Sequence, residues 1–353
     1  MSKIKIGISM GDMNGIGLEV ILKTLERKEI LNLCTPIIYS SSKVVAYHKN
    51  LVGFDDLQFQ SIRGAEKPFI GRINVVNCWQ EMANITLGDA TAEGGKYAFE
   101  SLKRAVQDLK KGLIDAIVTA PINKQAMQLS GFPYPGHTEF LSDELGDGKS
   151  LMLLVSEQMR MGLVTNHLPI EQVAKSISKE LVMHKIILLN EALKMDFGLE
   201  RPTIAVLGLN PHASDGGVLG TEEEAIIRPA VVECKKNGIM CVGPFAADGF
   251  FGNRQYQKFD GILAMYHDQG LIPFKTISFG EGVNFTAGLR GIRTSPDHGT
   301  AFDIAGKNEA DPGSFRQALY LAIDISRNRA MFQEISHSKK DKREQPSEPS
   351  EEG

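Results

Sequence analysis

The stretch IKIGISMGDMNGIGLEVILKTLER, residues 4–27, decides the fold class of this chain. It opens with an apolar, β-branched run that is typical of a buried strand, and the turn GDMNG ends that run. Beyond the turn, apolar side chains recur at helical spacing, namely at Ile16, Val20, Ile21 and Leu25. The stretch therefore predicts a strand, a tight turn and a helix in direct succession.

The alternation of strand and helix continues along the chain. Further strands are predicted from apolar runs that end in polar or proline turns: TPIIYS (35–40), INVVN (73–77), LIDAIVTAP (113–121), RPTIAVLGLN (201–210) and FDGILAMYHD (259–268). SLMLLV and MRMGLVT flank a tight turn and are expected to pair, and residues 89–111 are predicted to form a long amphipathic helix. This pattern predicts an α/β fold with a mainly parallel sheet that helices cover on both faces.

The composition argues against several classes of protein. The chain is 42% hydrophobic and 23% charged, as in ordinary soluble proteins, and its longest apolar runs are far too short to span a membrane. A net charge of −4 offers no basic surface for nucleic acid. The four cysteines lack CxxC spacing, so we expect buried thiols in a reducing compartment. Since the N-terminus also lacks a signal-peptide stretch, we expect a cytoplasmic protein without membrane or nucleic-acid partners.

Three histidines lie in polar segments that follow predicted strands: His167 in VTNHLP, His212 in GLNPHASDGG and His267 in MYHDQG. Strand ends are where α/β proteins place their chemistry. Three neutral imidazoles that meet at one point would bind a divalent metal and leave a position open for substrate. Their wide separation matches no local motif such as HExxH, so spacing alone leaves a shared metal site undecided.

Other polar residues are candidates for binding an anion. His137 and Thr138 precede a predicted helix start, where they could bind a phosphate or carboxylate, although Thr138 is equally suited to cap the helix. In the polar stretch 266–306, Lys275 and Arg293 are suited to clamp an anionic group. Small and apolar residues interleave throughout that stretch, which favours an ordered wall over a solvated loop.

Taken together, these segments resemble the 4-hydroxythreonine-4-phosphate dehydrogenase family, PdxA, of pyridoxal phosphate biosynthesis. Seven motifs occur in the order and spacing of the family: GDMNGIGLE, PGHTEFL, TNHLPI, GLNPHASDGG with TEEE, YHDQGLIPFK, GVNFT and IRTSPDHGTAFDIAG. The resemblance covers roughly residues 3–330. The chain has GDMNGIG where the family usually has GDPAGIG, NPHASD for NPHAGE, and AADG for PADT. These departures leave the substrate preference and the cofactor edge open.

The resemblance implies one divalent metal per subunit, held by His167, His212 and His267 in a site shared between the subunits of a homodimer. Zinc suits all-imidazole ligation best, with cobalt or magnesium as alternatives. The resemblance also implies substrate contacts from five side chains: His137, Thr138, Lys275, Asn284 and Arg293. Asp248 and Asp268 are candidates for orienting a ligand or relaying a proton.

The fold implied by the resemblance has two α/β/α domains with mainly parallel sheets, similar to isocitrate and isopropylmalate dehydrogenases, and an active site in the interdomain cleft. We expect residues 1–125 with 300–335 to form the first domain and residues 126–299 the second, which carries most metal and substrate residues. Residues 336–353 lack hydrophobic side chains and are predicted to be a disordered tail. NAD or NADP lies in the cleft of such a fold without a Rossmann fingerprint, and GDMNGIG indeed lacks GxGxxG. Residues that contact the cofactor cannot be named from the sequence.

The activity implied is the oxidation of 4-phosphohydroxy-L-threonine with NAD or NADP. The resulting 3-keto acid would decarboxylate to 3-amino-2-oxopropyl phosphate. One alternative is a dehydrogenase of a related phosphorylated hydroxy acid such as phospho-threonate. A metal-dependent hydrolase, which three histidines and a water would also serve, and a non-catalytic metabolite-binding protein are less favoured.

Overall fold

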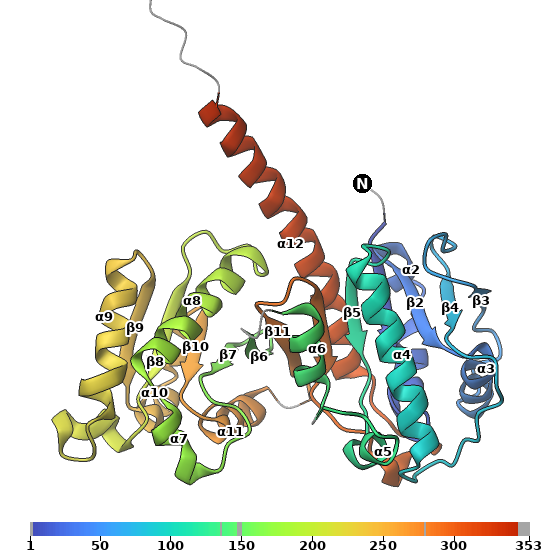
Figure 1. The fold of residues 1–353 in the computed structure, drawn as a ribbon, viewed down its shortest axis with the longest axis horizontal. Coiled ribbons are helices and arrows are strands. Elements are labelled where there is room, and N and C mark those ends of the chain that lie inside the picture. The colour runs from blue at the N-terminus through green and yellow to red at the C-terminus, as the bar shows by residue number, and fades with distance from the viewer. Residues whose placement is uncertain (1–2, 135, 147–149, 279, 345–353) are drawn as a thin grey trace, which may run out of the picture.

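The computed structural model describes the backbone of residues 3–134, 136–146, 150–278 and 280–344, and their side chains except those of Thr138 and residues 336–344. A twelve-stranded sheet runs through the whole molecule (Figure 1). Its strands are β1 (Lys5–Ser9), β2 (Thr35–Ser40), β3 (Phe59–Ile62), β4 (Ile73–Asn77), β5 (Ala116–Thr119), β6 (Leu151–Val155), β7 (Arg160–Leu163), β8 (Thr203–Leu207), β9 (Met240–Phe245), β10 (Gly261–Ala264), β11 (Val283–Ala287) and β12 (Ile292–Pro296).

Helices pack on both faces of this sheet. The α-helices are α1 (Gly17–Leu25), α2 (Ile30–Leu33), α3 (Ser42–Leu51), α4 (Ala92–Lys110), α5 (Lys124–Leu129), α6 (His137–Leu145), α7 (Ile170–Ser176), α8 (Lys179–Met195), α9 (Arg228–Lys236), α10 (Ala247–Gly252), α11 (His267–Ile277) and α12 (Gly313–Glu344). Shorter helical turns cover Pro211–Gly217, Glu223–Ile227, Gln255–Lys258 and Phe302–Ile304. No helix in the described part of the chain is both long enough and apolar enough to cross a membrane.

The strand order is β3-β4-β2-β1-β5-β12-β11-β6-β7-β10-β8-β9. Neighbouring strands are parallel except at β12–β11, β11–β6 and β6–β7. The predicted α/β fold with a mainly parallel sheet is therefore confirmed. The predicted antiparallel pair is confirmed as β6 and β7, and the predicted helix over 89–111 as α4.

The polar stretch 266–306 contains two strands, β11 and β12, that the sequence analysis did not predict. Both are short, and glycines and prolines flank them, so they resemble a loop when the sequence is taken alone. In β11, VNFTA alternates apolar and polar residues, which is the pattern of a strand with one apolar and one polar face. Here the polar face belongs to the candidate site.

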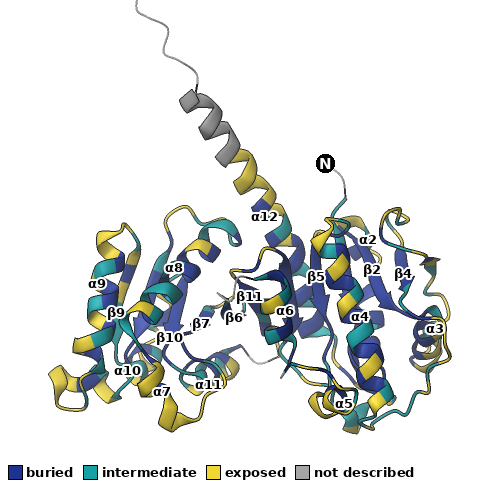
Figure 2. Ribbon diagram, in the orientation of Figure 1, coloured by how far each residue is buried: buried dark blue, intermediate teal, exposed yellow. Residues whose placement is uncertain are grey.

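Two hydrophobic layers cover opposite faces of the first half of the sheet. Helices α1 and α12 cover one face, where Val118 of β5 and Phe315 of α12 share a buried cluster. Helices α4 and α6 cover the other, where Ile117 and Leu102 share a second cluster. Figure 2 shows this pattern as buried strands beneath helices with exposed outer sides. Adjacent residues of β5 thus point to opposite faces, as the pleat requires.

The carboxyl ends of distant strands come to the same edge of the molecule. Traced through the pairings, β10 runs opposite to β5, five strands away. Twist rotates the strand direction by roughly 20–25° from each strand to the next, so five steps rotate it by more than a right angle. This rotation turns the carboxyl end of β10 toward the edge at which β5 ends. Figure 1 accordingly shows α5, α7 and α11, which follow β5, β7 and β10, along one lower edge of the molecule. This edge brings the candidate site residues toward one another.

The packing bears on the predicted domain boundaries. Strand β12 pairs with β5, and α6 packs with α4, although residues 126–299 were assigned to a second domain. The division itself stays a prediction. At the C-terminus, the backbone of residues 336–344 continues α12, where a disordered tail was expected. Lysine, arginine and glutamate are good helix formers and no glycine or proline interrupts this segment. Residues 345–353 lie outside the described part of the chain.

Candidate substrate and metal site

A buried arginine lies on the sheet face that α4 and α6 cover. Arg293 of β12 is only 3% exposed, and its register places it beside Ile117 of β5. Its Nε and Nη2 donate to Thr119 Oγ1 at 3.0 and 2.9 Å, and its Nη1 to Thr286 Oγ1 at 3.4 Å. The strands on either side thus fix the guanidinium through two hydroxyl groups.

Arg293 makes no ion pair with a described carboxylate: its hydrogen bonds go to threonine hydroxyls, and Glu139 acts on it only through its charge. Burial lowers the pKa of Arg293 to about 10, although Glu139 opposes the shift. The guanidinium therefore remains protonated at neutral pH. A buried cation is costly unless an anion accompanies it, so this position is suited to bind a carboxylate or a phosphate.

Two further predicted residues present open polar atoms in this region. His137 begins α6, and burial followed by the charge of Arg293 lowers its pKa to about 3, so its ring is neutral. Its Nε2 has no hydrogen-bond partner among the described residues, and neither does Oδ1 of Asn284 on β11. Thr138 follows His137 in α6, but its side chain lies outside the described set.

Lys275, the last predicted substrate residue, lies in a more open position. Its ammonium group is 3.4 Å from Asp297 Oδ2, and its side chain is 52% exposed. It belongs to the last turn of α11, the helix that His267 begins. Lys275 is therefore already paired, and an anion would have to compete with Asp297 for it.

Two of the three predicted metal ligands lie close together. The ring centroids of His167 and His267 are 5.5 Å apart. Main-chain pairing of β7 with β10 continues past both strand ends, where Thr165 N and Oγ1 both donate to Met265 O. The two histidines follow this pairing by two residues on each strand, which explains their proximity.

The electrostatics of this pair suit metal binding. Burial, then Lys124 and His267, lower the pKa of His167, while Glu139 opposes the shift, so the ring is neutral as a ligand must be. His267 Nδ1 is 2.7 Å from Asp268 Oδ1. A carboxylate at Nδ1 leaves Nε2 free to bind a metal and fixes the ring orientation. This contact places the Asp268 carboxylate at His267 Nδ1, and an orienting role for Asp268 stays a prediction. Asp248 is exposed in the first turn of α10, in a separate segment.

The third histidine lies in an unusual turn. His212 is exposed and begins a run of positive φ angles, from 46° to 68°, that also includes Ala213, Ser214, Asp215 and Gly216. Such a left-handed conformation costs roughly 1–2 kcal/mol for each residue other than glycine. A turn with four such residues needs strong local support.

Within one chain, the described residues form no group of three or more His, Cys, Asp or Glu side chains that could hold a metal. His212 therefore does not complete the pair of His167 and His267 in this chain. The pair itself fits a cation, because both rings are imidazoles at a strand-end edge and one has its Nδ1 bound by a carboxylate.

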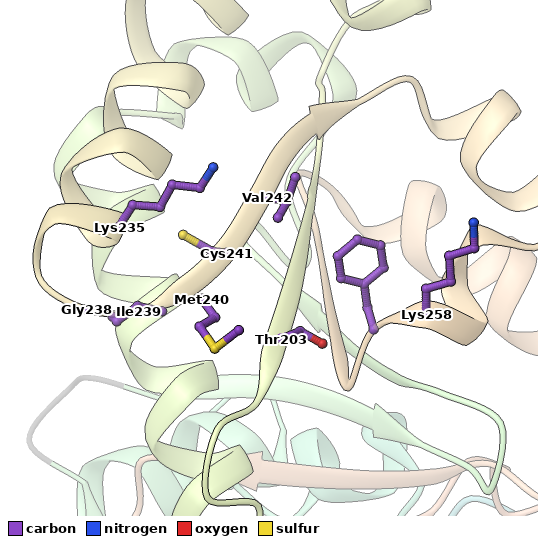
Figure 3. A pocket seen from close by; sticks show the side chains of 9 residues that line it. Thr203, Lys235, Gly238, Ile239, Met240, Cys241, Val242 and Lys258 are labelled. Atoms are coloured by element: carbon purple, nitrogen blue, oxygen red, sulfur yellow. The ribbon is translucent and has the colours of Figure 1, made fainter.

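A hollow of about 400 Å³ beside the edge strand β9 (Figure 3) contains none of the predicted residues, and the starts of β8 and β9 line it.

The structure adds four residues that the sequence analysis missed. Thr119 and Thr286 bind Arg293, while Glu139 and Lys124 set the charge around His167. The hydroxyl groups had one available signal, since Thr119 is the polar residue of an otherwise apolar strand and Thr286 is a polar residue of an alternating strand. Lys124 is exposed at the start of α5 and Glu139 is partly buried in the first turn of α6, and nothing in the local sequence separates them from ordinary surface charges.

Comparisons with known proteins match nearly the whole chain. The family model described as "Pyridoxal phosphate biosynthetic protein PdxA" matches residues 32–322. A 4-hydroxythreonine-4-phosphate dehydrogenase from Bacteroides thetaiotaomicron is 52% identical over 331 residues, which cover 93% of this chain and 90% of that protein. The crystal structure of a 4-hydroxythreonine-4-phosphate dehydrogenase from Klebsiella pneumoniae has a TM-score of 0.80 and 34% identity, covering 92% of this chain and 98% of that one. A second, from Burkholderia phymatum, has a TM-score of 0.79 and 39% identity, covering 92% and 99%. With its fold and its motifs both matched over nearly the whole length, the chain belongs to the PdxA family.

Proposed function

We propose that the protein is a cytoplasmic dehydrogenase of vitamin B6 biosynthesis that oxidises 4-phosphohydroxy-L-threonine with NAD or NADP. Hydride passes from the carbinol carbon to C4 of the nicotinamide, and the hydroxyl group loses its proton. The resulting 3-keto acid then loses CO2 to give 3-amino-2-oxopropyl phosphate. Family membership and the names of the relatives support this substrate class.

The observation that carries the proposal is the buried, unpaired guanidinium of Arg293. A doubly anionic substrate needs a fixed cation, and Arg293 can bind a planar or tetrahedral anion through two N–H groups. His137 and Asn284 offer further polar atoms beside it. Lys275 lies at the more open rim and would supply a second cation. Together with Thr138, these residues are our proposed substrate contacts.

We assign the divalent cation to His167, His212 and His267, with zinc as the preferred ion and cobalt or magnesium as alternatives. When bound, the cation would act as a Lewis acid toward the substrate hydroxyl. Asp268 would keep the His267 ring oriented through Nδ1. Asp248 and Asp268 remain our candidates for accepting the hydroxyl proton.

We infer that a second copy of the chain completes the site in a homodimer. Exposed apolar side chains follow each histidine segment: Leu168 and Ile170 after His167, Val218 and Leu219 after His212, and Ile272 after His267. Large exposed apolar residues around a polar centre are typical of an interface that another protein surface covers. The incomplete histidine set of one chain supports the same conclusion.

An NADH-release assay tests the proposal. Purified protein, supplied in turn with Zn²⁺, Co²⁺ or Mg²⁺, is given 4-phosphohydroxythreonine with NAD or NADP. We expect an absorbance increase at the nicotinamide wavelength that requires the added metal. Greater turnover of phospho-threonate would shift the proposal to the related hydroxy acid, and loss of substrate without any nicotinamide nucleotide would favour a hydrolase instead.

A further inference from the structure

Glu223 is a buried carboxylate that the proposed function does not use. It lies in the segment TEEE and has 0% exposure. The next residue, Glu224, is exposed and pairs with Arg228 on the surface. A carboxylate leaves water at a large cost unless hydrogen-bond donors surround it. The burial of Glu223 therefore points to a specific set of partners.

Those partners all lie at the entrance of the left-handed turn. Glu223 Oε1 accepts from the backbone N–H groups of Leu209 and Asn210, both at 2.7 Å. Its Oε2 accepts from Asn210 Nδ2 at 3.0 Å. These residues directly precede the turn Pro211–Gly217, which carries His212 as its second residue. The carboxylate thus holds the chain where the strained conformation begins.

The backbone packs closely against this carboxylate. A Cβ atom on Gly208 would lie 3.1 Å from Glu223 Oε1 and 3.1 Å from Ala213 Cα, so only glycine fits easily between the carboxylate and the turn. Gln269 links Gly208, and with it the start of the turn, to the segment that carries His267. Its Nε2 donates to Gly208 O at 2.6 Å, and its Oε1 accepts from Met265 N at 2.7 Å.

We propose that Glu223 is a positioning residue that holds His212 ready to bind the cation. Its three accepted hydrogen bonds offset the unfavourable backbone of the turn, so that the exposed imidazole has a fixed location before metal arrives. This inference rests on the proposed function, because it takes His212 as a ligand. It adds a role for a residue that is neither a proposed metal ligand nor a proposed substrate contact.

The test compares Glu223→Ala and Glu223→Gln with the matched control Glu224→Gln in the full chain. In metal-free protein, hydrogen exchange at the amides of Leu209 and Asn210 should accelerate in Glu223→Ala and stay unchanged in the control. The Kd for Co²⁺, followed by its visible absorption, should rise about 10–100-fold in Glu223→Ala, the range typical of residues that orient metal ligands. Glu223→Gln keeps an oxygen for both backbone donors but turns an amide toward Asn210, so its Kd should be intermediate.

Three outcomes would overturn the inference in distinguishable ways. If His212→Ala binds Co²⁺ less tightly than the unaltered protein while Glu223→Ala binds it equally well, the positioning role alone is wrong. If His212→Ala has no effect on Co²⁺ binding, the ligand assignment fails and the role of Glu223 fails with it. A merely structural role would instead weaken Co²⁺ and inorganic phosphate binding to the same extent in Glu223→Ala. A positioning role leaves phosphate binding unchanged, because the proposed anion site at Arg293 does not include the turn.

Discussion

Two regions at the same sheet differ in almost every physical respect: the arginine region, which is Arg293 with Thr119 and Thr286, and the histidine region, which is His167, His212 and His267. Arg293 is a strand residue, 3% exposed, and adjacent strands fix it. His167 and His212 lie beyond strand ends and are exposed. The hydrogen-bond partners of Arg293 all belong to its own chain, whereas the described residues of one chain do not bring the three histidines together.

This contrast indicates which interactions fix the positions of the side chains in each region. A strand is held by its neighbours along its whole length, so a side chain on it needs little further support. A residue in a loop depends on a few specific contacts, such as those of Glu223 with Leu209 and Asn210. We therefore expect substitutions in the arginine region to act on substrate binding, and those in the histidine region on metal binding and assembly.

The strongest test of the contrast is His267→Ala. We expect turnover to fall roughly 10³-fold or more, because a bound cation contributes several kcal/mol of charge stabilisation. Since the ring is partly exposed, the melting temperature should change little. Metal analysis and NADH release would measure both effects. Full metal occupancy in this variant would show that His267 is not a ligand.

The same variant can show whether two subunits share the site. If His267 and His212 of one site come from different subunits, mixing His267→Ala with His212→Ala chains gives heterodimers with one intact site. Random exchange would then restore roughly a quarter of the activity of the unaltered dimer. Activity that stays at the level of the separate variants would place all three ligands in one chain.

Arg293→Ala tests the buried region. Loss of a buried charged hydrogen-bonding group typically costs about 2–5 kcal/mol in binding, so kcat/KM should fall roughly 30-fold to several-thousand-fold. Affinity for NAD should stay nearly unchanged, as measured by NADH fluorescence titration. Equal losses for substrate and NAD would mean that Arg293 does not contact the substrate.

Asp12 tests whether burial at a strand end changes the pKa of a side chain enough to affect stability. It is 0% exposed, its Oδ2 has no partner among the described residues, and burial raises its pKa to about 6 from 3.8. The folded state therefore binds the proton more tightly, and stability is lost as pH rises from about 4 to 6. Asp12→Asn should remove this loss. The difference in free energy of unfolding between the variant and the unaltered protein should therefore shift in favour of the variant by up to about 3 kcal/mol from pH 4 to pH 8. Urea unfolding of both proteins at the two pH values measures it, and an equal difference at both would contradict the prediction.

Asp268→Asn probes the support of the exposed histidine pair. The amide can no longer accept as a carboxylate does at His267 Nδ1, so the Kd for Zn²⁺ should rise about 10-fold, at the lower end for residues that orient ligands. Competition with a chelating dye would measure the affinity. Because Asp268 is 67% exposed, the free energy of unfolding should hardly change. An unaltered Kd would leave Asp268 without an orienting role.

Deletion of residues 336–353 should have the smallest effect. This segment carries no hydrophobic side chain and lies beyond both regions in sequence. We expect kcat and KM to stay within experimental error of the full chain in the NADH-release assay. A large drop in turnover would show that the last part of α12 contributes to assembly or catalysis.

Most of the fold was predictable because strong apolar periodicity marks its elements. The run before GDMNG is β1, and the helix expected over 89–111 is α4. Strands β11 and β12 were not predicted, because short alternating runs between glycines and prolines carry little local signal. The motifs gave roles to Arg293 and the three histidines. Glu139 and Glu223 lie in the motifs PGHTEFL and TEEE but received no role, and Thr119 lies outside the motifs, because the importance of all three depends on which distant residues they meet.

Side-chain chemistry and local pattern depend only on the order of residues, so the chain alone determined the α/β class, the family and the imidazole, guanidinium and carboxylate groups available for chemistry. Burial and proximity depend on segments far apart in sequence, so only the folded molecule decided which of these groups are buried and which lie together. It gave Arg293 an unpaired charge, brought His167 and His267 together and left His212 apart on its left-handed turn. The physical reason is that solvation and distance set the energy of a polar group, and neither is a property of a single residue.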